Sequence, residues 1–352
     1  SEENEATYEW LTETPDVLKL YVLGGTPEGG NYYSSLTQLS RLYNEYEIDF
    51  TNTTRLGNKW NPNLTYGDLY KKMAITLSLT HAQPVRLWMQ PSAAENQSDA
   101  LKRYAIFKYL HKNEKLVVTR NDEGEPVIDI TPWFETLQIE EMRFIMNNAI
   151  DDEEILWLNA YVQQNIDENQ SRVWSYLTPH PYMAYVWPNY GNSIYYDEAN
   201  KAYFNEQFGI KNAKDSEEKT GMFDLEYTIP GGKDNPTYTI KITRGTTDYK
   251  LYKVWMNFRN KFGTGAVCGG ISKTGSNIRT THGIPATVIG QPGHAALLYY
   301  TKVDDPANPA YGKGYWGIDN DVSGWTLSEK GERMLLGWGN DRYSRGYSVV
   351  YM

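Results

Sequence analysis

Cysteine is almost absent from this chain, because Cys268 is the only cysteine among 352 residues. A single cysteine cannot form a disulfide within the chain, and it cannot supply the several thiolates of a cysteine-rich zinc site. A disulfide scaffold and a cysteine-based metal centre are therefore excluded. Any role of this thiol must be that of an isolated side chain.

Other features are scarce as well. No segment approaches the roughly 20 consecutive apolar residues of a membrane helix, so we expect no membrane insertion. No dense run of lysine or arginine offsets the net charge of −10, which argues against nucleic acid as a partner. The five histidines lie far apart, and none forms a pair with the spacing of two metal ligands on one helix. We therefore expect no metal and no cofactor.

Two acidic clusters, 151–154 and 304–305, contain the carboxylates that calcium prefers but lack the regular spacing of a calcium loop. We interpret both clusters as solvated surface. The glycines around Cys268 lack the lysine and the serine or threonine that end a phosphate-binding loop. Neither feature predicts a ligand.

The composition that is present is that of a folded protein, and its pattern changes along the chain. The sequence is 40% hydrophobic and 14% aromatic, which argues against disorder on a large scale. Segments in 1–215 have apolar spacings of three and four, which predict helices. Alternating segments at 222–229 and 237–243 predict a β-hairpin. We expect an α+β protein with a mostly helical N-terminal region, 1–215, and a second domain, 216–352.

Local signals place several helices in the N-terminal region. Thr65 and Asp68 suit the start of a largely buried helix over the apolar stretch 69–79. Asp99 precedes another helix, which should end near His111 because cations suit the C-terminal end of a helix dipole. Further helices are expected at 33–43, 131–137, 142–148 and 153–164, and the polar stretch 211–220 predicts the domain boundary.

Cys268 stands before a polar segment that we expect to be a helix. That helix should end near His282, since Gly283 suits the residue that follows a helix. A helix that begins at the cysteine lowers the pKa of the thiol through the positive end of its dipole, and the thiolate is the nucleophilic form. Gly269 and Gly270 have no Cβ, so a substrate can approach the sulfur closely. This pattern favours a catalytic thiol.

His294 and Asp319 lie where a base and an orienting acid are needed. His294 opens one of two expected neighbouring strands, 294–300, and Asp319 closes the other, 314–319. In an antiparallel pair joined by the intervening loop, residue 300 should lie opposite about 313, and residue 294 opposite about 319 on the same face. Asp319 then orients the imidazole, whose other nitrogen faces the thiol.

Several further residues complete the candidate site. Asp321 has the same parity as Asp319 and is the alternative acid. The backbone N–H of Cys268 is a candidate oxyanion donor, and Gln291 is the candidate second donor. The candidates for the substrate cleft are Gly269, Gly270, Trp316 and the tryptophan of the Val186-Trp187 pair. Strand candidates at 286–290 and 346–351 complete the expected sheet.

Each of these residues also has a simpler interpretation. A lone buried cysteine usually packs as a small apolar residue. A histidine in a strand is usually structural, and an aromatic stretch such as 174–196 more often packs in core and loops than binds a ligand. The order of the three groups, the glycines around the cysteine and the facing strand ends together favour catalysis.

Four short motifs in the segment 255–325 form one pattern: Val267-Cys268-Gly269, Gly283-Ile284-Pro285-Ala286, His294-Ala295 and Trp316-Gly317-Ile318-Asp319. By these motifs the segment resembles the transglutaminase-like superfamily, a branch of the papain-like cysteine enzymes. The resemblance implies a papain-like domain whose antiparallel sheet packs on the cysteine-bearing helix. It also implies Cys268 as the nucleophile, His294 as general base and acid, and Asp319 as the orienting residue.

The sequence departs from the family pattern at two positions. Gly269 stands where family members often have tryptophan, and Thr287 stands where they often have arginine. These differences concern the substrate more than the three catalytic positions.

We therefore expect a cysteine-dependent amide hydrolase, a peptidase or amidase, that acts on a protein, peptide or glycopeptide through a Cys268 thioester. Two alternatives stay open. One is acyl transfer to an amine on the same triad, since water access and acceptor binding decide between the two reactions. The other is a non-enzymatic carbohydrate-binding module that uses the aromatic-rich surface. The 29 tyrosines and 11 tryptophans and the abrupt start at Ser1 favour a secreted or cell-surface portion of a longer, multimodular protein.

Overall fold

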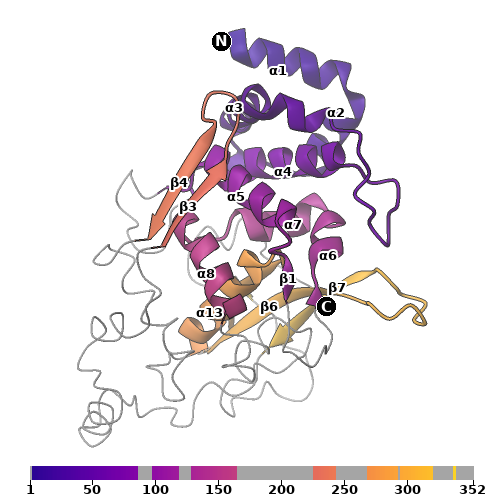
Figure 1. Ribbon diagram of the computed structural model, residues 1–352, viewed down its shortest axis with the longest axis vertical. Helices are drawn as coiled ribbons and strands as arrows, with labels where there is room; N and C mark the ends of the chain where they lie inside the picture. Colours follow the sequence, from indigo (N-terminus) through magenta and orange to yellow (C-terminus); the bar gives the residue numbers. More distant parts are fainter. Residues whose placement is uncertain are drawn as a thin grey trace, which may run out of the picture.

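The protein combines helices with small antiparallel sheets in a computed structural model (Figure 1), which describes residues 2–85, 97–118, 128–164, 225–242, 268–291, 294–319 and 336–337. Its helices are α1 (Glu2–Glu13), α2 (Pro15–Leu23), η1 (Glu28–Gly30), α3 (Tyr32–Phe50), α4 (Tyr66–Thr80), α5 (Ala100–Lys112), α6 (Thr131–Glu135), α7 (Ile139–Met146), α8 (Asp152–Gln164) and α13 (Cys268–Thr281). Its strands are β1 (Val117–Val118), β2 (Ile128–Asp129), β3 (Leu225–Pro230), β4 (Thr237–Ile242), β5 (Ala286–Gln291), β6 (His294–Lys302), β7 (Gly314–Asp319) and β8 (Leu336–Gly337). The expected α+β composition is confirmed.

The helices with clear end signals lie where they were expected. At the start of α4 the Thr65 hydroxyl oxygen accepts a hydrogen bond from the Asp68 N–H at 3.1 Å, and the Asp68 carboxylate accepts one from the Thr65 N–H at 3.1 Å. This reciprocal pair is a capping box. α5 ends at Lys112, with His111 in its last turn. The bounds of α1 and α2 were not predicted individually, but both helices lie in the region 1–215 that was expected to be mostly helical.

We expect Thr65→Ala to lower the free energy of unfolding by about 1 kcal/mol, because the first turn of α4 loses a side-chain cap. Urea denaturation of the full chain measures this difference. Thr51→Ala is the control, since the Thr51 hydroxyl only donates to the carbonyl of Ile48 within its own exposed helix end. Equal midpoints for Thr65→Ala and wild type would contradict a stabilising cap.

The larger sheet has the strand order β7-β6-β5-β8, and all its paired strands are antiparallel. The expected neighbours β6 and β7 are therefore confirmed as neighbours. The separate hairpin of β3 and β4 is also confirmed, with Leu225 paired to Ile242 and Pro230 to Thr237. The strand expected at 346–351 lies outside the described residues.

Helix α13 lies between the sheet and the N-terminal helices (Figure 1). It packs against β5 and β6 and also contacts α7 and α8. The expected packing of the antiparallel sheet on the cysteine-bearing helix is therefore present. This arrangement makes α13 the element through which the helical region and the sheet meet.

One hydrophobic core extends through the helical region and the sheet. It includes Leu77 of α4, Phe134 of α6, Ile278 of α13 and Leu297 of β6, all fully buried. A smaller cluster of Ile289, Ala296 and Leu298 occupies the other face of the sheet. The expected boundary at 211–220 lies outside the described residues, so the division into 1–215 and 216–352 stays a prediction.

The acidic cluster at 151–154 is mostly buried, so its interpretation as solvated surface was wrong. Asp152 is 3% exposed, and its carboxylate accepts a hydrogen bond from the Nε of Arg103 at 2.6 Å. A charge can be buried when it is paired, and this partner comes from a distant helix that the local sequence does not indicate. At 304–305 the interpretation is confirmed, because Asp304 and Asp305 are exposed.

Candidate active site

Cys268 is the first residue of α13, and Gly269 and Gly270 follow it in the first turn. The helix therefore begins at the cysteine, as the sequence predicted. A helix N-terminus presents backbone N–H groups and the positive end of the dipole. Position 268 therefore lies at the positive end of the helix dipole.

The other end of α13 also agrees with the prediction. The last helical residue is Thr281, and Gly283 has a φ of +73°, in the left-handed region that favours glycine after a helix. The Nδ1 of His282 donates to the carbonyl of Ile278 at 2.8 Å. His282 therefore satisfies a carbonyl of the last turn.

Two serine hydroxyls fix the direction in which α13 runs along the β5–β6 hairpin. Ser276 donates to the carbonyl of Ala286, at the start of β5, at 3.1 Å. One turn earlier, Ser272 donates to the carbonyl of Ala295, near the start of β6, at 3.5 Å. The N-terminus of α13 therefore points toward the turn that joins β5 to β6.

Cys268 and His294 consequently lie at the same end of this helix–hairpin unit. Cys268 comes about one helical turn before Ser272. His294 is paired with Gln291 at the β5–β6 turn. For Cys268, Gln291 and His294 the structure describes the backbone and not the side chain. Two positions that are 26 numbers apart in the sequence are thus brought to one end of the sheet.

The register between β6 and β7 differs from the expected one by three residues. Asp319 is the last residue of β7, but it pairs with Leu297 rather than lying opposite His294. Position 319 is therefore about 10 Å along β6 from position 294, at about 3.3 Å per residue. A shift by an odd number also changes which positions share a face of the sheet. The expected facing of positions 294 and 319 was wrong.

The loop between the two strands explains the difference. Pairing continues to Lys302 and Gly314, beyond the expected end of β6 at residue 300. The Val303 N–H then donates to the carbonyl of Lys313 at 3.0 Å, and the Gly312 N–H donates back to Val303 at 2.7 Å. Nothing in the local sequence fixed this long turn to one register. The assignment of Asp319 as the orienting acid stays a prediction.

Trp316, on β7, lies beside the end of β6 that is opposite to His294. It pairs with Tyr300, is half-buried, and its ring centroid is 4.6 Å from that of Phe144 on α7. The contact connects the edge strand to the helical region. Trp187 and the alternative acid Asp321 lie outside the described residues, as does the aromatic stretch 174–196.

The other histidines with described side chains are buried. His81, His111 and His282 are each at most 6% exposed. Burial lowers the pKa of His81 to about 3 and that of His282 to about 4, so both imidazoles are neutral at pH 7. None of these three imidazoles is accessible to a substrate.

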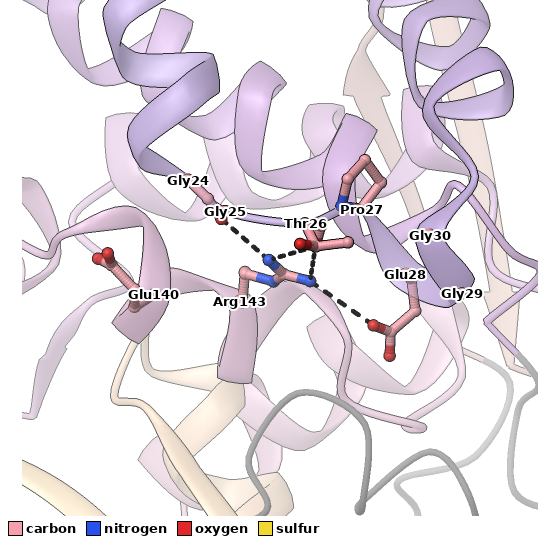
Figure 2. A pocket seen from close by; sticks show the side chains of 9 residues that line it. All are labelled: Gly24, Gly25, Thr26, Pro27, Glu28, Gly29, Gly30, Glu140 and Arg143. Carbon is pink, nitrogen blue, oxygen red and sulfur yellow. Dashed lines mark hydrogen bonds and ion pairs between the residues drawn. The ribbon is translucent and has the colours of Figure 1, made fainter.

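A separate pocket of about 560 Å³ lies beside α7, at the loop that joins α2 to α3 (Figure 2). The sequence analysis missed it, although the paired glycines at 24–25 and 29–30 were a signal; Gly25 has a φ of +79°. Arg143 donates to the carbonyl of Gly24 at 2.9 Å and to that of Thr26 at 3.0 Å, and its guanidinium is 3.6 Å from the Glu28 carboxylate. These contacts, all made by Nη1 and Nη2, anchor the loop to α7.

Two further findings concern the described part of the chain. It contains no group of three or more histidine, cysteine, aspartate or glutamate side chains that could hold a metal ion. None of its helices combines the length and the apolar character needed to cross a membrane.

The chain matches no family model, no curated protein and no solved structure with which it was compared. The resemblance to the transglutaminase-like superfamily therefore depends on the motif residues around Cys268, His294 and Asp319 alone.

Proposed function

We propose that the protein is a cysteine-dependent amide hydrolase with Cys268 as its nucleophile. The observation that supports this most strongly is the position of Cys268 at the first residue of a 14-residue helix, at the same end of the hairpin as His294. A helix start lowers the pKa of a thiol, and a nearby imidazole accepts its proton. A helix that begins with cysteine and packs on an antiparallel sheet also supports a papain-like form of the α+β fold.

The proposed reaction has two halves. His294 takes the proton of the Cys268 thiol, and the sulfur attacks the carbonyl carbon of an amide in a protein, peptide or glycopeptide. The oxyanion accepts hydrogen bonds from the backbone N–H of Cys268 and from Gln291, and the amine leaves with a proton from His294. Water, deprotonated by His294, then attacks the thioester and releases the carboxylic acid. Transfer to an amine instead of water is the alternative outcome.

The orienting acid in this proposal is Asp319 or Asp321. The β6–β7 register pairs Asp319 with Leu297, and Asp321 has the same parity as Asp319, so the register favours neither acid over the other. The carboxylate that orients the His294 imidazole should no longer do so when the aspartate is replaced with asparagine. Asp319→Asn and Asp321→Asn therefore discriminate between the two.

The test is the rate of Cys268 alkylation by iodoacetamide as a function of pH, in wild type and in His294→Ala. Because the chain has one cysteine, the reaction reports on that thiol alone. We expect an inflection below about pH 7 in wild type and a higher one in His294→Ala, closer to the ordinary value of about 8.5. The urea-unfolded wild type is the control for an unperturbed thiol.

A slow profile with an ordinary inflection in both folded proteins would refute the proposed nucleophile. If the thiol is activated, two assays separate the candidate reactions. Release of new amino groups from a peptide mixture indicates hydrolysis, and incorporation of a fluorescent primary amine into protein indicates acyl transfer. Cys268→Ser should abolish either signal. Binding to glycans that survives Cys268→Ser, without either reaction, would favour the binding module.

A further inference from the structure

We propose that Asn148, in the link between α7 and α8, is a positioning residue that sets the placement of α13 and thereby the reactivity of Cys268. The helical N-terminal region then forms part of the catalytic unit. This inference rests on the proposed function and deepens it, because it names the element that controls the same site.

Helix α13 needs directional contacts because its buried surface is mostly polar. Among the side chains of α13 that the structure describes as buried, that of Ile278 is apolar. The others are polar or charged: Ser272, Lys273, Ser276, Asn277, Arg279, Thr280 and Thr281. Apolar packing tolerates small rotations and shifts of a helix, whereas hydrogen bonds require particular distances and angles. The orientation of α13 therefore depends on its hydrogen-bond partners.

The Asn148 side chain forms hydrogen bonds with three of these polar residues of α13. Its amide nitrogen donates to the Thr280 hydroxyl at 2.8 Å and to the Ser276 hydroxyl at 3.2 Å. Its amide oxygen accepts from the backbone N–H of Ile150 at 3.0 Å and from the ammonium of Lys273 at 3.4 Å. Residues 273, 276 and 280 lie on one face of the helix. A single amide thus contacts successive turns of α13.

Ser276 transmits this contact to the sheet. Its hydroxyl accepts from Asn148 and donates to the carbonyl of Ala286 on β5. Positions 268, 272 and 276 follow one another at intervals of about one turn, so they lie in one row along α13. A rotation or shift of the helix that breaks the Ser276 contact therefore also moves position 268 relative to His294. Displacements of about 1 Å can alter catalytic geometry strongly.

Asn148 is itself held rigidly by α5. The fully buried Arg103 donates from Nη1 to the carbonyls of Met146 and Asn148, both at 2.8 Å. It also donates from Nη2 to the carbonyl of Ile150 at 2.7 Å, and from Nε to Asp152. The link between α7 and α8 is therefore fixed by the helical region before it contacts α13.

The experiment compares Asn148→Ala and Asn148→Asp with wild type by the pH profile of Cys268 alkylation. Asn148→Asp keeps the acceptor but loses both donors. Asn58→Ala is the matched control: Asn58 is also a buried asparagine whose side chain makes four hydrogen bonds, and their partners are Pro132, Glu135, Trp60 and Asn61 rather than α13. Urea unfolding of each variant measures the accompanying loss of stability.

We expect both Asn148 variants to move the alkylation inflection upward, toward the ordinary value of about 8.5, while Asn58→Ala keeps the wild-type profile. If Asn148→Ala does not fold, Thr280→Val replaces it in the test, because it removes one hydroxyl of the contact and keeps the side-chain shape. The same upward shift of the alkylation inflection is then expected for Thr280→Val. Wild-type profiles in the Asn148 and Thr280 variants, or an equal shift in Asn58→Ala, would overturn the inference. An ordinary profile in wild type would instead refute the proposed function.

Discussion

Replacing Arg103 with methionine is expected to lower the free energy of unfolding by about 3–5 kcal/mol, the range for removal of one partner from a buried ion pair. Arg103 is fully buried, and its guanidinium is paired with the Asp152 carboxylate at 2.6 Å. Methionine fills much of the volume but leaves this carboxylate without its cation. It also leaves the carbonyls of Met146, Asn148 and Ile150 without a donor. Urea denaturation, monitored by tryptophan fluorescence, measures the loss.

The neighbouring residue gives the control. Lys102 forms an ion pair with Glu153, but both side chains retain contact with solvent. Exposed pairs contribute about 0–1 kcal/mol, so Lys102→Met should have a small effect. Arg103→Lys should not restore stability, because an ammonium cannot reproduce the planar set of donors. Similar losses for Arg103→Met and Lys102→Met would contradict the assigned role of the buried pair.

Mild acid is expected to destabilise the fold through two buried histidines. Burial lowers the pKa of His81 to about 3, with the Arg103 guanidinium contributing, and burial lowers that of His282 to about 4. The unfolded chain binds a proton at each imidazole below about pH 6.5, whereas the folded protein does not. The stability that the two neutral imidazoles contribute is therefore present above about pH 6.5 and is lost progressively as the pH decreases toward their folded-state pKa values. At pH 5 the loss is about 2 kcal/mol for each histidine.

Unfolding free energies of wild type and His282→Gln at pH 8, 7 and 5 test this. Glutamine can still donate to the carbonyl of Ile278 but does not titrate. The difference between the two proteins should be constant from pH 8 to 7, and His282→Gln should gain about 2 kcal/mol relative to wild type at pH 5. Parallel pH dependences would show that His282 does not cause the acid sensitivity.

Local signals in the sequence predicted the elements that carry the candidate site. Cys268 begins a helix, Gly283 follows its end with a positive φ, and His294 opens β6. Each of these features depends on residues within a few positions of one another. The capping box at Thr65 belongs to the same class. Such features follow from backbone conformation and from short-range hydrogen bonds.

Features that depend on distant partners were not predicted. The predicted register of β6 and β7 was wrong because the sequence of the long loop between them does not indicate how the strands pair. The burial of Asp152 depends on Arg103, which lies 49 positions earlier. The bond from Asn148 to Thr280 spans 132 positions. Nothing in the local sequence around Asp152 or Asn148 indicates these distant partners.

The shared hydrophobic core has a consequence for the inheritance of this chain. Ile278 and Leu297 are buried in the same cluster as Leu77 and Phe134 of the helical region. A descendant gene that kept the cysteine-bearing half and lost the helices would expose these side chains and leave the polar surface of α13 without its partners. Recombination that separated the two parts would therefore destabilise the segment that bears Cys268.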